Sequence, residues 1–219
     1  MHVDPAPHLL WITSRAAGIV ALGAASLSVS LGLAMSLRLR RPRRGDLRVL
    51  HETLSLSALV AIGVHGATLL GDGFLHPSVL DISVPFVSSY KTFWTSLGIL
   101  SGWALALLGL SYYLRGRIGP ARWRRLHRFT ALAWLLGLAH SVGEGTDAGT
   151  VWFLAMTGVV AIPALLLLVT RVSLSGGGGD RSRGVALDGV SRANSPARAL
   201  PLPGRAAGVV GSDASGGRA

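Results

Sequence analysis

The chain has 219 residues, of which 50% are hydrophobic and only 14% are charged. This composition excludes an ordinary water-soluble domain, in which about a quarter of the residues carry charge. The net charge of +11 does not indicate nucleic acid binding, because the basic residues stand in short blocks between long apolar segments. Cysteine is absent, which excludes disulfides, iron–sulfur clusters and thiol catalysis by this chain.

Five apolar segments approach the length that a helix needs to cross a membrane, about 17 to 25 residues. They cover residues 9–37, 49–71, 92–114, 126–142 and 149–170. The sequence therefore predicts an all-α, polytopic membrane bundle with five transmembrane helices. Residues 1–8 form an extracytoplasmic N-terminus, residues 9–171 the transmembrane domain, and residues 172–219, rich in Gly, Ser, Ala and Arg, a disordered cytoplasmic tail.

The distribution of charge between the segments predicts the orientation of the chain. Arginines fill residues 38–48 and 115–125, whereas the alternate loops hold carboxylates and a single lysine. By the positive-inside rule the N-terminus lies outside and the C-terminus in the cytoplasm of a plasma-membrane protein. The first segment has no basic residues before it and no small-residue cleavage site after it, so we expect a retained helix and not a signal peptide.

Four of the seven histidines lie within predicted spans: His51 and His65 in the second, and His127 and His140 in the fourth. Both spans run from inside to outside, and His51 and His127 each follow a basic segment, so these two share one depth (the inner pair). His65 and His140 follow 14 and 13 residues later and share a second depth (the outer pair). Ionisable residues inside a bilayer are rare and usually functional.

Two imidazoles at each depth, without cysteine or methionine ligands, favour two-histidine coordination of a planar metal complex over a zinc or calcium site. Haem iron with two axial histidines is the natural interpretation. In an ideal helix His140 points about 140° away from His127, so we expect either a tilt of this helix or a local distortion near Gly137. Gly63 and Gly66, beside His65, are consistent with a flat cofactor close to the backbone.

The histidine spacing, the basic segment before each first histidine and the opening SRAAGIVAL at residues 14–22 resemble the ferric reductase-like transmembrane domain family. This family includes ferric reductases, NADPH oxidases and the haem-binding membrane subunits of bacterial methionine sulfoxide reductase systems (YedZ/MsrQ type). The resemblance covers residues 9–171 and implies b-type haem, with His51 and His127 holding an inner group and His65 and His140 an outer one. Four histidines allow two haems or one.

Two departures from the family affect the expected partners. Family members usually have six spans and this sequence shows five, and the flavin and nicotinamide domain of the oxidases is missing from it. The resemblance therefore implies an electron-transfer subunit of a membrane oxidoreductase, with a separate electron donor, either a flavoprotein or a membrane quinol. The acceptor is expected outside the cytoplasm, either as a free acceptor or as a reductase subunit.

Two further residues are candidates for binding the cofactor. Arg15 is the only charge within the first span and lies at the depth of the outer pair; it either binds a propionate of the outer haem or extends toward lipid headgroups. Trp134 lies at mid-depth, away from the interfaces where membrane tryptophans gather. It either relays electrons between the haems or packs against lipid or a neighbouring helix.

The sequence leaves two other classes of function open. The histidines could bind metal ions or relay protons in a transporter or channel, although the internal repeat and interrupted helices typical of transporters are not evident. Alternatively, they could form hydrogen bonds between the helices of a structural membrane anchor.

Overall fold

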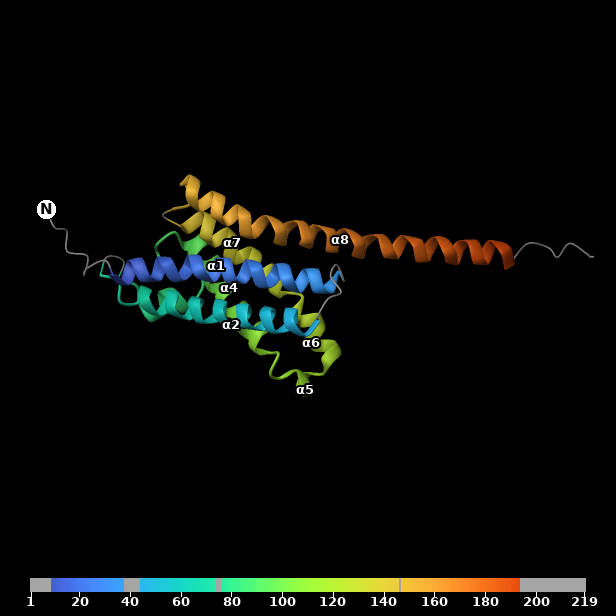
Figure 1. Ribbon diagram of the computed structural model, residues 1–219, viewed down its shortest axis with the longest axis horizontal. Coiled ribbons are helices and arrows are strands. Elements are labelled where there is room, and N and C mark those ends of the chain that lie inside the picture. Colours follow the sequence, from blue (N-terminus) through green and yellow to red (C-terminus); the bar gives the residue numbers. More distant parts are fainter. Residues whose placement is uncertain (1–8, 38–43, 74–75, 146, 194–219) are drawn as a thin grey trace, which may run out of the picture. The chain divides into compact units, whose positions relative to one another are not determined.

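The computed structural model describes residues 9–37, 44–73, 76–145 and 147–193, and within these ranges the protein is helical without a β-strand. The elements, in chain order, are α1 (Leu9–Ser36), α2 (Arg44–Leu69), α3 (Val79–Ser83), α4 (Thr92–Leu110), α5 (Arg115–Ile118), α6 (Pro120–His127), α7 (Thr130–Glu144) and α8 (Val151–Ala193). Figure 1 labels most of them. The predicted all-α class is confirmed.

The chain divides into two units, residues 1–175 and residues 176–219, which are described separately. The described part of the second unit, residues 176–193, is helical. The predicted disordered tail is therefore not confirmed over residues 172–193, where an existing helix can extend without the cost of a new nucleus. The rest of that prediction, residues 194–219, and the predicted N-terminal segment 1–8 lie outside the described residues.

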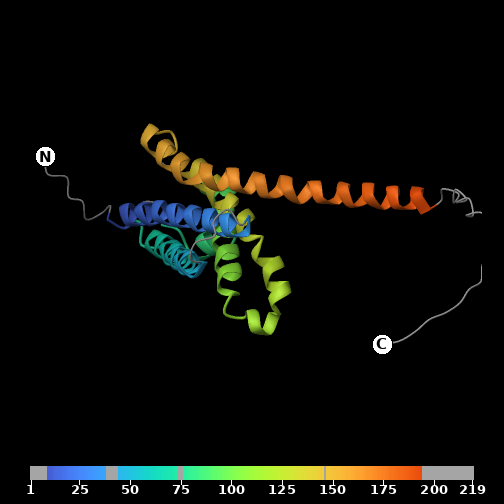
Figure 2. The same ribbon diagram turned by 45° about the vertical axis from the view of Figure 1, so that its right-hand side comes forward.

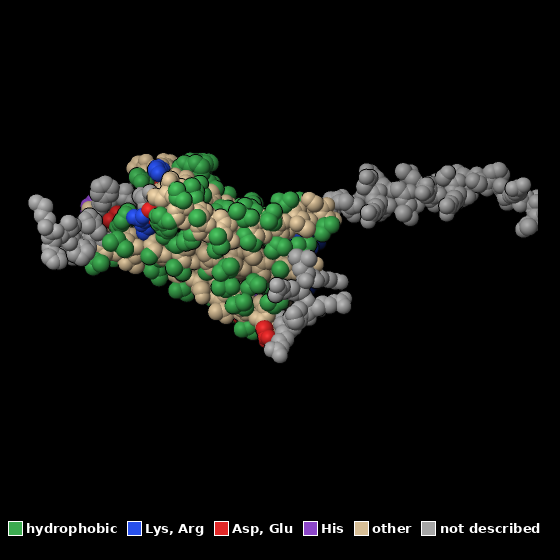
Figure 3. Space-filling model, turned by 45° about the horizontal axis from the view of Figure 1, so that its top comes forward, with side chains coloured by type: hydrophobic (Ala, Val, Ile, Leu, Met, Phe, Trp, Pro, Cys, Tyr) green, Lys and Arg blue, Asp and Glu red, His purple; other side chains and the backbone are tan. Residues whose placement is uncertain are grey.

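Four helices in the described part are long and apolar enough to cross a membrane: α1, α2 from Gly45, α4, and α8 as far as Leu174. The fourth predicted span, residues 126–142, is not confirmed. Over that segment α6 ends at His127 and α7 begins at Thr130, and the 15 residues of α7 extend over about 22 Å, short of the ~30 Å of a bilayer core. Hydrophobic side chains cover much of the visible face of the first unit (Figure 3), which fits a membrane protein.

The first unit is built from two antiparallel helix pairs, α1 with α2 and α4 with α7. Figures 1 and 2 both show α1 and α2 side by side. In the first pair Ser14 contacts His65 and Ser28 contacts His51; in the second, Trp94 contacts His140. Because α1 also packs against α7 in the antiparallel sense, α2 and α7 run parallel, as the sequence predicts for the segments that carry the histidines.

Small side chains allow these helices to approach closely, as is usual in membrane bundles. One cluster of the buried core consists of a large side chain, Trp134, surrounded by four alanines, Ala25, Ala58, Ala161 and Ala164. Trp134 is 1% exposed, and its Nε1 donates a hydrogen bond of 3.0 Å to the Ser26 hydroxyl of α1. Of the two roles expected for Trp134, packing against neighbouring helices is found; the relay role stays a prediction.

We predict that Trp134→Ala lowers the free energy of unfolding by about 3 to 5 kcal/mol, because it leaves a cavity among side chains too small to fill it. Thermal unfolding in detergent micelles, followed by circular dichroism, measures the change. Trp152→Ala is the matched control, because that indole is 50% exposed. Equal loss of stability in both variants would contradict the assignment of Trp134 to the core.

Candidate functional site

The structure brings the four histidines of the predicted spans together in two pairs. The ring centroids of His51 and His127 are 6.2 Å apart, with the ring planes at 88°. Those of His65 and His140 are 6.4 Å apart, with the planes at 71°. The pairing expected from helix depth is the pairing found, and 14 residues of α2 separate the two pairs by about 21 Å along the helix axis.

The separation within each pair matches the space for one metal atom between two imidazoles. A bond from a metal to an imidazole nitrogen is about 2 Å long and the ring centroid lies roughly 1.2 Å behind that nitrogen, so facing ligands place their centroids about 6.4 Å apart. A direct hydrogen bond between two ring nitrogens, about 2.9 Å long, would bring the centroids to about 5.3 Å. Among the described residues no hydrogen bond joins the rings of either pair, so the two rings of a pair do not bridge their helices to each other directly.

Three of the four rings are oriented by a hydrogen bond from Nδ1 to a helix carbonyl. His65 donates to the Ser14 carbonyl at 2.8 Å, His51 to that of Ser28 at 2.9 Å, and His140 to that of Trp94 at 2.9 Å. A carbonyl can only accept, so Nδ1 carries the proton and Nε2 keeps its lone pair. Metal-binding histidines almost always have this second hydrogen bond, which fixes the tautomer and makes the ligand more basic.

A glycine one helical turn after each of these carbonyls provides the space for the ring. A Cβ on Gly18 would lie 3.2 Å from Nδ1 of His65, and one on Gly32 would lie 3.2 Å from Cε1 of His51. A Cβ on Gly98 would lie 2.6 Å from Nδ1 of His140, closer than side chains tolerate. By contrast, nothing lies within 4 Å of a Cβ added to Gly63 or Gly66, so neither glycine makes room for a histidine ring, and the expectation that they lie beside a flat cofactor stays a prediction.

The 140° mismatch expected between His127 and His140 is resolved by a break in the helix. His127 is the last residue of α6, and Arg128 and Phe129 form a tight turn, with Phe129 N donating to the Leu126 carbonyl at 3.0 Å, before α7 begins. Such a turn winds more tightly than an α-helix and rotates the following residues. The expectation of a distortion at Gly137 is wrong: Gly137 lies inside α7, where it packs against the Ser101 hydroxyl of α4.

His127 has a different environment from the other three histidines. Its Nδ1 is buried without a hydrogen-bond partner in the described part of the chain. Its ring instead stacks on Trp123, one turn earlier in α6, with centroids 4.9 Å apart and the planes at 24°. The Trp123 ring in turn lies against the Tyr112 ring, with the ring centroids 5.7 Å apart.

The set of donors fits a macrocyclic metal complex better than a bare metal ion. No cluster of three or more His, Cys, Asp or Glu side chains that could hold a metal ion occurs among the described residues. Each pair offers two imidazoles on opposite sides, so the remaining coordination positions would have to come from the cofactor itself. Haem supplies four such nitrogens and leaves two axial positions for histidine.

Arg15 has a partner within the chain. Its guanidinium forms a salt bridge with Asp147, in the loop between α7 and α8, including a hydrogen bond of 2.6 Å from Nε to Oδ2. The guanidinium also lies over the Trp11 ring, 4.7 Å from its centroid. The anion that a cation at this depth requires is therefore supplied by Asp147 within the chain, and contact of Arg15 with a haem propionate stays a prediction.

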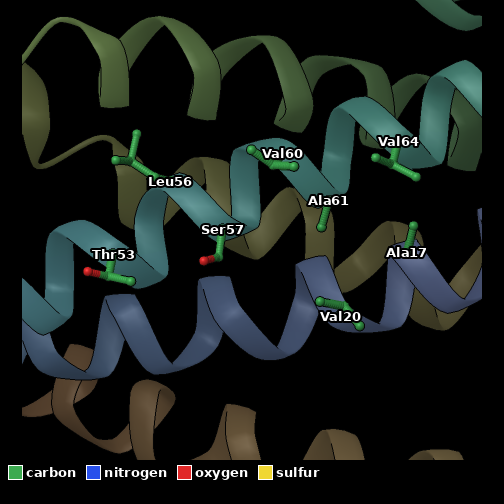
Figure 4. A pocket seen from close by; sticks show the side chains of 8 residues that line it. All are labelled: Ala17, Val20, Thr53, Leu56, Ser57, Val60, Ala61 and Val64. Carbon is green, nitrogen blue, oxygen red and sulfur yellow. The ribbon is translucent and has the colours of Figure 1, made fainter.

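A shallow groove between α1 and α2 is separate from the paired histidines (Figure 4). It is lined mainly by apolar side chains, with the hydroxyls of Thr53 and Ser57 among them: Ala17, Val20, Thr53, Leu56, Ser57, Val60, Ala61 and Val64. No histidine lines it. Its lining suits contact with lipid chains and provides no group for catalysis.

The serines and glycines that position the rings were not predicted, although the sequence contains a pattern that indicates them. In α1 a serine followed four residues later by a glycine occurs twice, at Ser14 with Gly18 and at Ser28 with Gly32. The two occurrences are 14 residues apart, the same spacing that separates His51 from His65 on the antiparallel α2. Two helices that contact each other at two levels need the same residue spacing between the two contacts, as here between Ser14 and His65 and between Ser28 and His51.

Comparison of the chain with models of protein families, with curated proteins and with solved structures finds no match. The functional argument therefore depends on the geometry of the paired histidines.

We predict that His51, His65 and His140 are Nδ1-protonated tautomers in the protein without cofactor, because each donates from Nδ1 to a carbonyl. Nitrogen-15 chemical shifts of labelled histidine distinguish the two tautomers. Gly98→Ala should displace the His140 ring and change its shifts, whereas Gly66→Ala, with open space around its added methyl group, should not. Nε2-protonated rings at these positions would contradict the proposed orientation.

Proposed function

We propose that this protein is a haem-binding membrane protein that transfers electrons across the bilayer. In this proposal His51 and His127 hold one b-type haem, and His65 and His140 hold a second. A bound haem iron takes up and releases one electron at a time. The resemblance of the sequence to the ferric reductase-like transmembrane domains supports the same function.

The observation that carries the proposal is the pair of imidazole separations, 6.2 and 6.4 Å. Each is within about 0.2 Å of the separation expected for two facing ligands on one metal atom. Three of the four rings keep Nε2 free by hydrogen bonding through Nδ1. A proton relay or an interhelix anchor needs neither the metal-sized gap nor the same tautomer at both levels.

The chain's own residues perform three tasks in this function. The histidines fix the cofactors at two depths, and the serine and tryptophan carbonyls of α1 and α4 orient the rings. Ala58 lies on α2 halfway between His51 and His65, and it packs in the core with Trp134. This core keeps water out of the region between the two levels. The salt bridge between Arg15 and Asp147 joins α1 to the loop after α7 near the outer pair.

The direction of transfer follows from the positive-inside rule, which places the inner pair at the cytoplasmic face of the plasma membrane. Electrons enter there from a separate flavoprotein or from a membrane quinol, and leave from the outer pair to an extracytoplasmic acceptor or reductase subunit. In this respect the chain acts as an electron-transfer subunit of a membrane oxidoreductase.

We predict that the purified protein carries two low-spin b-type haems per chain when haem supply is sufficient during expression. His51→Ala or His127→Ala should remove one haem, and His65→Ala or His140→Ala should remove the other, since the ring pairs are separate. Haem is quantified as the pyridine complex against protein mass, and low-spin character is checked by absorption spectroscopy.

His76→Ala is the matched control, because His76 is exposed in a loop and belongs to neither pair. It should retain both haems. A wild-type protein that binds no haem would exclude the proposed function. Loss of all haem in each of the four single variants would instead reduce the proposal to one haem or to cooperative binding.

A further inference from the structure

The inner and outer pairs differ in the hydrogen bonds behind their imidazoles. In the outer pair both rings donate from Nδ1 to a helix carbonyl, at 2.8 Å for His65 and 2.9 Å for His140. In the inner pair only His51 does so, and Nδ1 of His127 is buried without a partner among the described residues. An imidazole without this hydrogen bond is a less basic ligand. The inner pair therefore donates less electron density to a metal than the outer pair.

Helix α4 supports His140 and His127 differently. The backbone of Leu108 interacts with the His127 ring, but the contact lies outside the geometry of a hydrogen bond. Trp94 supplies the carbonyl for His140, and Gly98, one turn later, leaves room for the ring. Fourteen residues further along the chain, at the level of the inner pair, the corresponding residues are Leu108, in α4, and Tyr112, in the turn that follows it. Tyrosine takes the place of the glycine, and the His127 ring stacks on Trp123 instead.

Positive charge also gathers beside the inner pair. Arg48 donates a hydrogen bond of 2.6 Å to the Tyr112 hydroxyl, and the Arg115 guanidinium lies 3.9 Å from the centroid of the same ring. Neither arginine forms a salt bridge within the described part of the chain, whereas Arg15 near the outer pair is neutralised by Asp147. The inner end holds two described carboxylates, Asp46 and Glu52, against eight arginines with described side chains: Arg48, Arg115, Arg117, Arg122, Arg124, Arg125, Arg128 and Arg171.

We infer that the inner pair imposes a higher reduction potential on its metal than the outer pair does. A less basic ligand and a surplus of positive charge both favour the state that holds one more electron. The inference rests on the proposed function, since it assigns a property to haem held at each pair. It implies that a chain carrying a single electron holds it at the inner pair.

The test is a potentiometric titration of the full-length protein, with dithionite as reductant, ferricyanide as oxidant and the haem absorbance as readout. His65→Ala, which keeps the inner pair, should titrate at a higher potential than His51→Ala, which keeps the outer pair. Equal potentials, or the reverse order, would overturn the inference. A purified protein that contains no haem would instead contradict the proposed function. The titration therefore distinguishes failure of the proposed function from failure of this inference.

A second pair of variants tests the charge effect with both histidine pairs intact. Arg48→Gln should lower the potential of the upper of the two reduction steps and leave the lower step in place. Lys91→Gln removes a charge at the other end of the molecule, where Lys91 contacts the Gly143 carbonyl at 3.3 Å, and should leave the upper step unchanged. If Arg48→Gln moved only the lower step, or neither step, the inference would be wrong.

Discussion

The hydrogen bond from a histidine Nδ1 to the backbone carbonyl of a neighbouring helix is the interaction on which the rest of this structure depends. It can form only where two helices approach closely, which the small side chains of α1 and the glycines beside the rings permit. Because it occurs at two levels between α1 and α2, it also fixes their register. The same bond between α7 and α4 sets the position of His140. Together these bonds turn three Nε2 atoms away from the supporting helices and leave them free to bind a metal.

Much of the architecture could be predicted from the sequence, because a membrane helix needs a long apolar segment. Four of the five expected spans appear as helices of sufficient length, and the pairing of His51 with His127 and of His65 with His140 follows from their depth. The fourth segment was harder to predict. Its apolar run contains a break at Arg128 and Phe129, which no Pro or Gly marks, so the distortion was expected near Gly137 instead. A turn stabilised by local backbone hydrogen bonds leaves little trace in composition.

The supporting residues could not be derived from residue type alone. Ser14 and Ser28 accept from the rings through their backbone carbonyls, which every residue possesses, while their hydroxyls contact the same histidines. Gly18 and Gly32 act through the absence of a side chain. Only the shared 14-residue spacing on α1 and α2 indicates them. Arg15 and Trp134 were expected to be unusual because of their depth, but the partners of both, Asp147 and Ser26, come from segments distant in the sequence. Such contacts require the packed structure.

The central claim is that each histidine pair holds a single metal between its two rings, and electron paramagnetic resonance of the oxidised wild-type protein tests it most directly. The ring planes within the pairs are nearly perpendicular, at 88° and 71°. Low-spin ferric haem with perpendicular axial imidazoles gives a strongly anisotropic signal with one unusually large g value. The account predicts this signal from both haems. The ordinary rhombic signal of parallel imidazoles, or a high-spin signal from iron with a single histidine, would contradict it.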